Sequence, residues 1–223
     1  MADRPIVVVL VSGGLDSCVA AAQAAVDHRP AFLHLSYRQR TEARELRAFT
    51  ALADHFEAEP RLVLEATFIE RIGGTSLVGS GLPVPEDEPV PGEIPTTYVP
   101  FRNANLLGIA VAWAETLDAT AVYIGAHQAD SAYPDCRASF FAAYNLMVAA
   151  GIRSDRKVEI RTPLIDLDKA EIVRRGAALH APLHLTWSCY QSQELACGRC
   201  HSCRLRLAGF RAAGLEDPIP YAR

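Results

Sequence analysis

The sequence predicts an α/β fold, with a doubly wound parallel sheet of five strands followed by a small, cysteine-rich C-terminal subdomain. Short β-branched runs alternate with helical stretches along most of the chain. A glycine turn directly follows the first of these runs, and four of the six cysteines gather near the C-terminus. Strands separated by helices are typical of a parallel sheet that carries helices on both faces.

The expected strands and helices alternate along the chain. The expected strands comprise residues 6–11, 31–37, 61–64, 121–125 and 159–162. The expected helices comprise residues 15–27, 42–57, 103–117, 139–150, 168–179 and 203–213. Ligands of such sheets bind beyond the carboxyl ends of the strands, where Ser12, Tyr37 and His127 fall.

One expected helix shows which of its faces is buried. Leu106, Ile109, Ala110 and Trp113 recur at helical spacing within 103–117. Apolar residues at this spacing form a stripe that packs against the core. We therefore expect these four side chains to face the sheet.

The stretch 72–100 interrupts the alternation of strands and helices. It is rich in Gly and Pro and contains the acidic run Glu86-Asp87-Glu88. Loops of this length inside a compact domain are either functional or disordered. We expect a lid over a bound ligand or a contact to another subunit, with the acidic run solvated.

Length and composition limit the possible classes of protein. At 223 residues the chain fits one main domain, expected over residues 1–185, with an appendage over 186–223. Half of the residues are hydrophobic and 22% are charged, which excludes global disorder. The net charge of −4 gives no general attraction to nucleic acid or an anionic membrane, and no apolar run reaches membrane-spanning length. We expect a cytoplasmic protein without a stable nucleic-acid partner.

The most informative segment is 6–17, where a β-rich strand ends in a Ser-Gly-Gly turn and a helix follows. Glycines let backbone amides approach an anion, and a helix start adds unpaired N–H groups and a positive dipole end. Ser12 and Ser17 add hydroxyl groups, while Asp16 is placed to organise Mg²⁺ or the turn. The segment predicts a pyrophosphate site, although Gly-Gly turns also follow strands in other α/β proteins.

The string Ser-Gly-Gly-Leu-Asp-Ser at 12–17 resembles the pyrophosphate loop of the ATP pyrophosphatase superfamily. Members of that superfamily cleave ATP between the α and β phosphates and adenylate a substrate. The resemblance implies the fold of the adenine nucleotide alpha hydrolases for the main domain. The turn lacks the Lys-Ser/Thr ending of a Walker loop, so chemistry at the γ phosphate is less favoured.

Cys189, Cys197, Cys200 and Cys203 follow a Cys-x7-Cys-x2-Cys-x2-Cys pattern. Two-residue separations let thiolates converge on one ion, and four anionic sulfurs suit a closed tetrahedral Zn²⁺ site. We expect structural zinc that joins the segment after Thr186 to the last helix. An iron–sulfur cluster is the alternative, because closely spaced cysteines also hold such clusters.

Three other residues carry simpler expectations. His201 lies within the cysteine pattern and is expected to face solvent, since four thiolates already satisfy a metal ion. Cys18 follows the glycine turn and is expected to be a buried, inert thiol. His127 is expected either to contact a nucleotide or to pack in the core.

Further motifs occur together with the loop and the cysteines. They are Val-Pro-Phe-Arg-Asn at 99–103, Gly-Ala-His-Gln-Ala-Asp-Ser-Ala-Tyr-Pro-Asp-Cys-Arg at 125–137, Thr-Pro-Leu at 162–164, Lys169, and Thr-Trp-Ser-Cys-Tyr at 186–190. Over almost the whole chain, the combination resembles the 7-cyano-7-deazaguanine synthase family, ATP-dependent ligases of queuosine biosynthesis that form a nitrile. The chain departs from the family pattern at Arg38 and Ala132, where glycine is common.

This resemblance implies that the chain converts 7-carboxy-7-deazaguanine and ammonia to the nitrile with ATP, binds zinc on the four cysteines, and forms a homodimer. It also implies that ATP lies along the loop and the first helix. The residues implied are Val11, Ser12, Gly13, Gly14, Leu15, Asp16, Ser17, Cys18, Val19, Ala20 and Ala21.

A carboxylate does not react directly with ammonia because its oxygen is a poor leaving group, and transfer to AMP removes that obstacle. We expect Ser12, Asp16 and Ser17 to hold ATP, with Mg²⁺ bridging the phosphates and stabilising the departing pyrophosphate. The resemblance implies a second adenylation, on the amide, and therefore two ATP per product. Lys169 and Arg102 are the cations expected beside the adenylate or carboxylate, although Lys169 is equally consistent with a surface lysine.

The segment around Tyr133 is the candidate substrate site. Asp135 is expected to accept hydrogen bonds from the N–H edge of a guanine-like base, and Tyr133 to stack on that base. Arg137 completes the site. Tyr-Pro-Asp is also an ordinary turn sequence, so a turn without substrate contact is the alternative.

Two other functions compete with the nitrile-forming ligase. A tRNA-thiolating enzyme also adenylates a base oxygen, but it needs sulfur-carrying cysteines and a basic RNA-binding face. Only Cys18 and Cys136 lie outside the cysteine pattern, and the net charge is negative. A zinc-dependent binding module on a degenerate nucleotide domain is the second alternative, and the intact loop at 12–17 argues against it.

Overall fold

The sheet of the protein is entirely parallel. The computed structural model describes residues 4–79, 81–86, 93–129 and 132–222. The strands are β1 (Ile6–Leu10), β2 (Arg29–Ser36), β3 (Arg61–Glu65), β4 (Ala121–Ile124) and β5 (Glu159–Arg161). They pair in the order β3-β2-β1-β4-β5, so the direction of winding reverses between β1 and β4. The predicted α/β fold with a five-stranded parallel sheet is confirmed.

The helices also agree with the sequence pattern. The α-helices described are α1 (Leu15–Asp27), α2 (Glu42–His55), α3 (Phe68–Ile72), α4 (Arg102–Thr116), α5 (Ala138–Gly151), α6 (Lys169–Ala178) and α7 (His201–Ala213). All six predicted helices are present, and their ends lie within two residues of the expected positions. The helix α3 was not predicted, because a single turn is too short to show a helical period.

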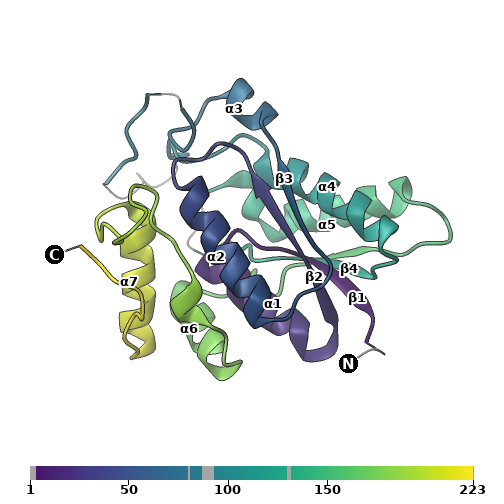
Figure 1. Ribbon diagram of the computed structural model, residues 1–223. Helices are drawn as coiled ribbons and strands as arrows, with labels where there is room; N and C mark the ends of the chain where they lie inside the picture. The colour runs from purple at the N-terminus through teal and green to yellow at the C-terminus, as the bar shows by residue number, and fades with distance from the viewer. Residues whose placement is uncertain (1–3, 80, 87–92, 130–131, 223) are drawn as a thin grey trace.

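Both faces of the sheet are covered by helices (Figure 1). Along β1, Val7 and Val9 pack with residues of α1, α2 and α6, whereas Val8 and Leu10 pack with residues of α4 and α5. A central parallel strand is buried on both sides, which explains why its sequence is a continuous apolar run.

The rotation of α4 differs from the expectation. Its buried side chains include Ala104, Leu107, Ala110 and Ala114, whereas Leu106, Ile109 and Trp113 remain partly exposed. Because this helix is apolar on most of its circumference, hydrophobic spacing alone did not define its inner face. The sheet instead receives the face that carries small residues, which lets the helix approach closely.

The stretch 72–100 packs against the rest of the chain where it is described. Leu77 belongs to the core shared with α4 and α5, and Val84 packs with residues of the cysteine segment. Asp87 and Glu88, in the predicted acidic run, lie outside the described residues. The role of this stretch as a lid or a subunit contact stays a prediction.

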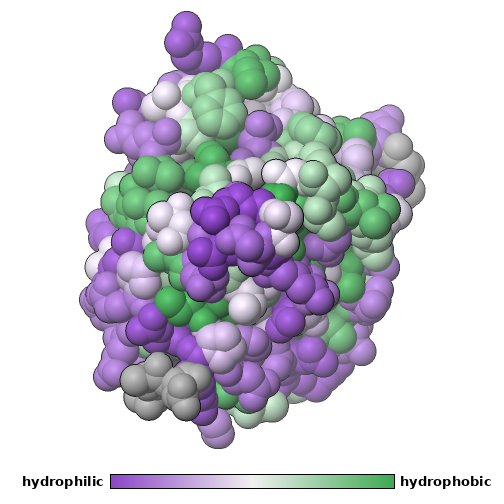
Figure 2. All heavy atoms as spheres, turned by 90° about the vertical axis from the view of Figure 1, so that its right-hand side faces the viewer, coloured by the Kyte–Doolittle hydropathy of each residue, from purple (hydrophilic) through white to green (hydrophobic). Residues whose placement is uncertain are grey.

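The outer surface on the side of α4 and α5 mixes hydrophobic with hydrophilic residues (Figure 2). Among its apolar residues, α5 exposes Leu146 and Met147. Within the described ranges, none of the helices combines the length and the hydropathy that crossing a bilayer requires.

The C-terminal segment packs closely on the main domain. The helix α7 lies beside α6, and at Gly209 a Cβ atom would lie 2.4 Å from Cγ and 3.1 Å from Cβ of Lys169. Only a residue without a Cβ atom fits this approach. The position of α7 therefore depends directly on the residue at which α6 begins.

We predict that Gly209→Ala destabilises the protein by about 1–3 kcal/mol, because the added methyl group forces α7 away from Lys169. Gly108→Ala is the matched control: Gly108 also lies inside a helix, but its Cβ would meet only the Tyr144 hydroxyl, at 3.6 Å. That control should be neutral or stabilising. Urea unfolding of both variants checks this, and equal stabilities would contradict the packing argument.

Candidate active site

A cavity of about 480 Å³ opens at the carboxyl ends of β1, β2 and β4. Its apolar lining includes Leu10, Leu33, Leu35 and Ile124. Four α-helices begin at this cavity, and the first residue of each lines it: Leu15, Arg102, Lys169 and His201. Helix N-termini present unpaired N–H groups and positive dipole ends, so their convergence favours an anionic ligand.

The glycine turn forms one wall of the cavity. Ser12 Oγ accepts a hydrogen bond from the Gly14 amide at 3.2 Å, and Ser17 Oγ donates to the Gly14 carbonyl at 2.9 Å. Gly13 has a φ of +89°, and a Cβ atom there would lie 2.7 Å from the carbonyl oxygen of Glu45. The turn is thus shaped by its own hydroxyl groups and by the close approach of α2.

An ion pair joins the start of α1 to the start of α6. Lys169 Nζ donates to Asp16 Oδ1 at 2.7 Å and to Oδ2 at 2.9 Å, and lies 3.1 Å from His127 Nε2. Burial would raise the pKa of Asp16, but the charges of Lys169 and His127 outweigh it and hold that pKa below the ordinary value of an aspartate. An Asp168–Glu171 capping box begins α6 and orients its first residue.

A second cation lies in the cavity without a carboxylate partner. Arg102 Nη1 donates to the Tyr37 hydroxyl at 3.3 Å, and no carboxylate of the described residues lies within ion-pair distance of this guanidinium. Burial would lower the pKa of Arg102, but Tyr37 and its other neighbours raise it overall. Tyr133 and Tyr190 also line the cavity, so a charged guanidinium stands among aromatic side chains. This combination suits a planar, anionic ligand.

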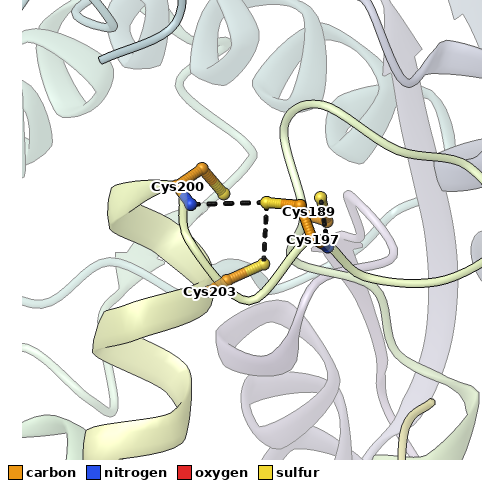
Figure 3. Close-up of side chains that lie close together, drawn as sticks. All are labelled: Cys189, Cys197, Cys200 and Cys203. Carbon is orange, nitrogen blue, oxygen red and sulfur yellow. Dashed lines mark hydrogen bonds between the residues drawn. The ribbon is translucent and has the colours of Figure 1, made fainter. Parts of the chain in front are cut away.

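The four cysteines of the C-terminal pattern converge at one point (Figure 3). Their sulfur atoms all lie within 4.8 Å of one another. Backbone amides of Gln191, Ser192 and Cys197 donate to the Cys189 sulfur at 3.3–3.4 Å. Tetrahedral Zn–S bonds of about 2.3 Å separate the sulfurs by about 3.8 Å, so this spacing fits a single ion. An iron–sulfur cluster would hold the thiolates farther apart, because irons and sulfides lie between them.

The cysteine segment touches the glycine turn directly. The Trp187 amide donates to the Gly13 carbonyl at 2.8 Å. The Trp187 ring packs in an apolar group with Cys189, Cys200 and Cys203. The metal-binding segment therefore helps to hold the turn in its conformation.

A family model described as "Queuosine biosynthesis protein QueC" matches residues 6–214. The chain belongs to the QueC family. It is 48% identical over 216 residues to the 7-cyano-7-deazaguanine synthase of Chlorobium phaeobacteroides strain BS1, a match that spans 96% of each chain. Its identity to the 7-cyano-7-deazaguanine synthase of Koribacter versatilis is 50% over 220 residues, spanning 96% of this chain and 92% of the relative. Among solved structures, the NMN synthetase of Francisella tularensis aligns over 96% of this chain and 78% of its own, with 16% identity and a TM-score of 0.49.

In this QueC chain, the predicted catalytic residues Ser12, Asp16, Ser17, Arg102 and Lys169 line the same cavity, and their catalytic roles stay predictions. The possibility that Lys169 is a surface residue is wrong, since it is 8% exposed. His201, expected to face solvent, also lines the cavity. His201 lies in the first helical turn of α7, which faces the cavity.

Several residues predicted to contact ATP do not line the cavity. Cys18, Val19, Ala20 and Ala21 are fully buried, because α1 packs against the sheet on one side and against α6 on another. Burial raises the pKa of the Cys18 thiol to about 12, which confirms an inert cysteine.

The expected substrate residues separate into two groups. Tyr133 lines the cavity, but Asp135 and Arg137 do not. The Asp135 carboxylate accepts the Asn103 amide at 2.9 Å, and its backbone carbonyl accepts the Asn103 side-chain amide at 2.8 Å. Asp135 thus satisfies the N-terminus of α4, and Arg137 is exposed.

The sequence analysis of the QueC chain missed Arg206. This side chain is 1% exposed and lines the cavity, and it donates to both Asp217 oxygens at 2.8 and 3.0 Å. It also donates to Thr186 Oγ1 at 2.7 Å and to the Ser188 hydroxyl at 3.2 Å. Its position three residues after Cys203, on the same face of α7, was the available signal.

We predict that Lys169→Met destabilises the QueC chain by about 3 kcal/mol at pH 7, because Asp16 is left without its cation. The folded-state pKa of Asp16 is depressed, so the pair contributes fully above pH 4 and its contribution is lost as pH falls through the lowered pKa. The stability gap between variant and wild type should therefore narrow in acid, as urea unfolding between pH 7 and pH 3 would measure. Lys157→Met, at an exposed lysine, is the control, and a gap independent of pH would contradict the assignment.

Proposed function

We propose that the chain is an ATP-dependent ligase that converts 7-carboxy-7-deazaguanine and ammonia to 7-cyano-7-deazaguanine. The observation that carries this proposal is one cavity lined by both the phosphate-type glycine turn and the unneutralised Arg102. The near full-length relatives named 7-cyano-7-deazaguanine synthase support the same reaction.

The turn at residues 12–14 and the first amides of α1 would hold the phosphates of ATP. Their N–H groups and the positive end of the helix favour the charge that develops on departing pyrophosphate. Bound Mg²⁺ would neutralise part of that charge, with oxygen ligands available from Ser12, Asp16 and Ser17. Lys169 fixes Asp16 in place and supplies a further positive charge at the same wall.

Arg102 would hold the substrate carboxylate. A guanidinium without a protein carboxylate can offer its N–H fork to the ligand, and its aromatic neighbours give a flat base a surface to pack on. Tyr133 and Tyr190 would contact the base. Adenylation then turns a carboxylate oxygen into a leaving group, and ammonia attacks the acyl carbon to give the amide. Adenylation of the amide oxygen and loss of AMP complete the nitrile.

Zinc on Cys189, Cys197, Cys200 and Cys203 would have a structural role, because all four positions are taken by sulfur. For the tRNA-thiolating alternative, the buried Cys18 thiol has a pKa raised to about 12 and is unsuited to sulfur transfer, which leaves Cys136, in the cavity lining, as the thiol this alternative would need. A homodimer, a cytoplasmic location and a domain division after residue 185 stay predictions.

Mass spectrometry of a reaction with ATP, Mg²⁺, ammonium and 7-carboxy-7-deazaguanine tests the proposed function. We expect the nitrile mass together with AMP and pyrophosphate. Arg102→Met should lower kcat/KM for the carboxylate substrate on the order of 100-fold, because its positioning is lost. ADP and phosphate as products, or a fully active Arg102 variant, would contradict the assignment.

We predict that removing the metal weakens ATP binding as well as stability. Cys197→Ser should lose bound zinc, measured by elemental analysis, and raise the KM for ATP, because Trp187 then holds Gly13 less firmly. Arg199→Ala changes an exposed residue between two of the ligands and should retain both zinc and the KM. Zinc loss with an unchanged KM for ATP would refute the link between the two sites.

A further inference from the structure

We propose that Glu45 recognises the guanine edge of the substrate and so determines which 7-deazapurine the cavity accepts. The inference rests on the proposed function and assigns a residue to the part of the substrate opposite its carboxylate. It replaces Asp135, whose carboxylate is occupied by the N-terminus of α4.

Within the described chain, the cavity is lined by two carboxylates, Asp16 and Glu45. Asp16 is neutralised by Lys169, at 2.7 Å. No cationic side chain of the described residues lies within ion-pair distance of Glu45. A negative group in this cavity therefore remains available to donors of the ligand.

The Glu45 carboxylate is held in one orientation by two buried side chains. Gln39 Nε2 donates to Oε2 at 2.9 Å, and Thr41 Oγ1 donates to Oε1 at 2.7 Å. Gln39 and Thr41 are only 5% and 2% exposed. Each carboxylate oxygen can accept a second hydrogen bond, so both stay able to receive donors from a ligand.

Tyr37 connects this carboxylate to the unneutralised guanidinium. Its backbone amide donates to Gln39 Oε1 at 2.8 Å, on the side of Glu45, and its hydroxyl accepts from Arg102 at 3.3 Å. The amide and the hydroxyl are opposite ends of one tyrosine. Glu45, through Gln39, and Arg102 therefore lie toward opposite ends of this residue, within the same cavity.

The substrate has the complementary arrangement. A guanine-type ring presents a ring N–H and an amino group side by side, and a carboxylate accepts both in the same plane. The carboxyl group of a 7-carboxy-7-deazapurine is on the other ring, where Arg102 would receive it. Placing the two donors on Glu45 and the carboxyl group on Arg102 satisfies both charges with one ligand.

The test compares two substrates with two enzymes. The probes are 7-carboxy-7-deazaguanine and the analogue without its 2-amino group, and the enzymes are the wild type and Glu45→Gln. We expect the variant to lose on the order of 10–100-fold in kcat/KM for the amino-bearing substrate, because a charge-assisted bond is lost. The analogue, already lacking one donor, should lose markedly less.

Glu42→Gln is the matched control, because Glu42 occupies the first turn of the same helix but does not line the cavity. It should leave both substrates unchanged. An equal loss for both substrates in Glu45→Gln, or a raised Mg²⁺ requirement or KM for ATP, would overturn the proposal and assign Glu45 to the nucleotide.

Calorimetric binding of 7-carboxy-7-deazaguanine, without ATP, separates this inference from the proposed function. Weaker binding by Glu45→Gln but not by Glu42→Gln supports base recognition even if no nitrile forms. Equal binding by both variants would overturn it even if the wild type makes the nitrile.

Discussion

The buried ion pair between Asp16 and Lys169 is the interaction on which the site depends. It joins the first turn of α1, which carries the phosphate-type loop, to the first turn of α6. The same lysine is the surface on which Gly209 of α7 rests. One side chain thus sets the relative positions of three helices, and each of them begins at the cavity. Such a pair is costly to break because either partner alone is a buried charge.

The cavity is organised by charge at its walls and by apolar side chains at its base. Helix N-termini and the cations Arg40, Arg102, Lys169 and Arg206 make the lining positive overall, which suits a triphosphate and a carboxylate together. The sheet beneath supplies Leu33, Leu35 and Ile124, which exclude water from the ligand without competing for its polar groups. Among the described residues that line the cavity, Glu45 is the one carboxylate without a cation in ion-pair contact. Under our proposal, this carboxylate receives the end of a flat ligand that is opposite its carboxyl group.

The parts of this architecture that sequence predicts are those encoded locally. A strand, a glycine turn and a helix follow one another within residues 6–27, and the cysteines are at most 14 residues apart, so spacing alone indicated both sites. The contacts of Asp135 and Arg206 depend on partners brought together by folding, and Glu45 meets the glycine turn at Gly13 only in the folded chain. Asp135 meets Asn103, 32 positions away, and nothing in the Tyr-Pro-Asp turn reveals that partner. The rotation of α4 was also hidden, because its hydrophobic residues extend around most of the helix.

The hydrogen bond from Trp187 to Gly13 has a consequence for how the protein is made. Its two residues are 174 positions apart in a chain of 223 residues. During synthesis, the N-terminal strand and helix leave the ribosome long before the tryptophan that completes the turn behind them. A nascent chain consequently carries an unfinished loop until this tryptophan has been synthesised.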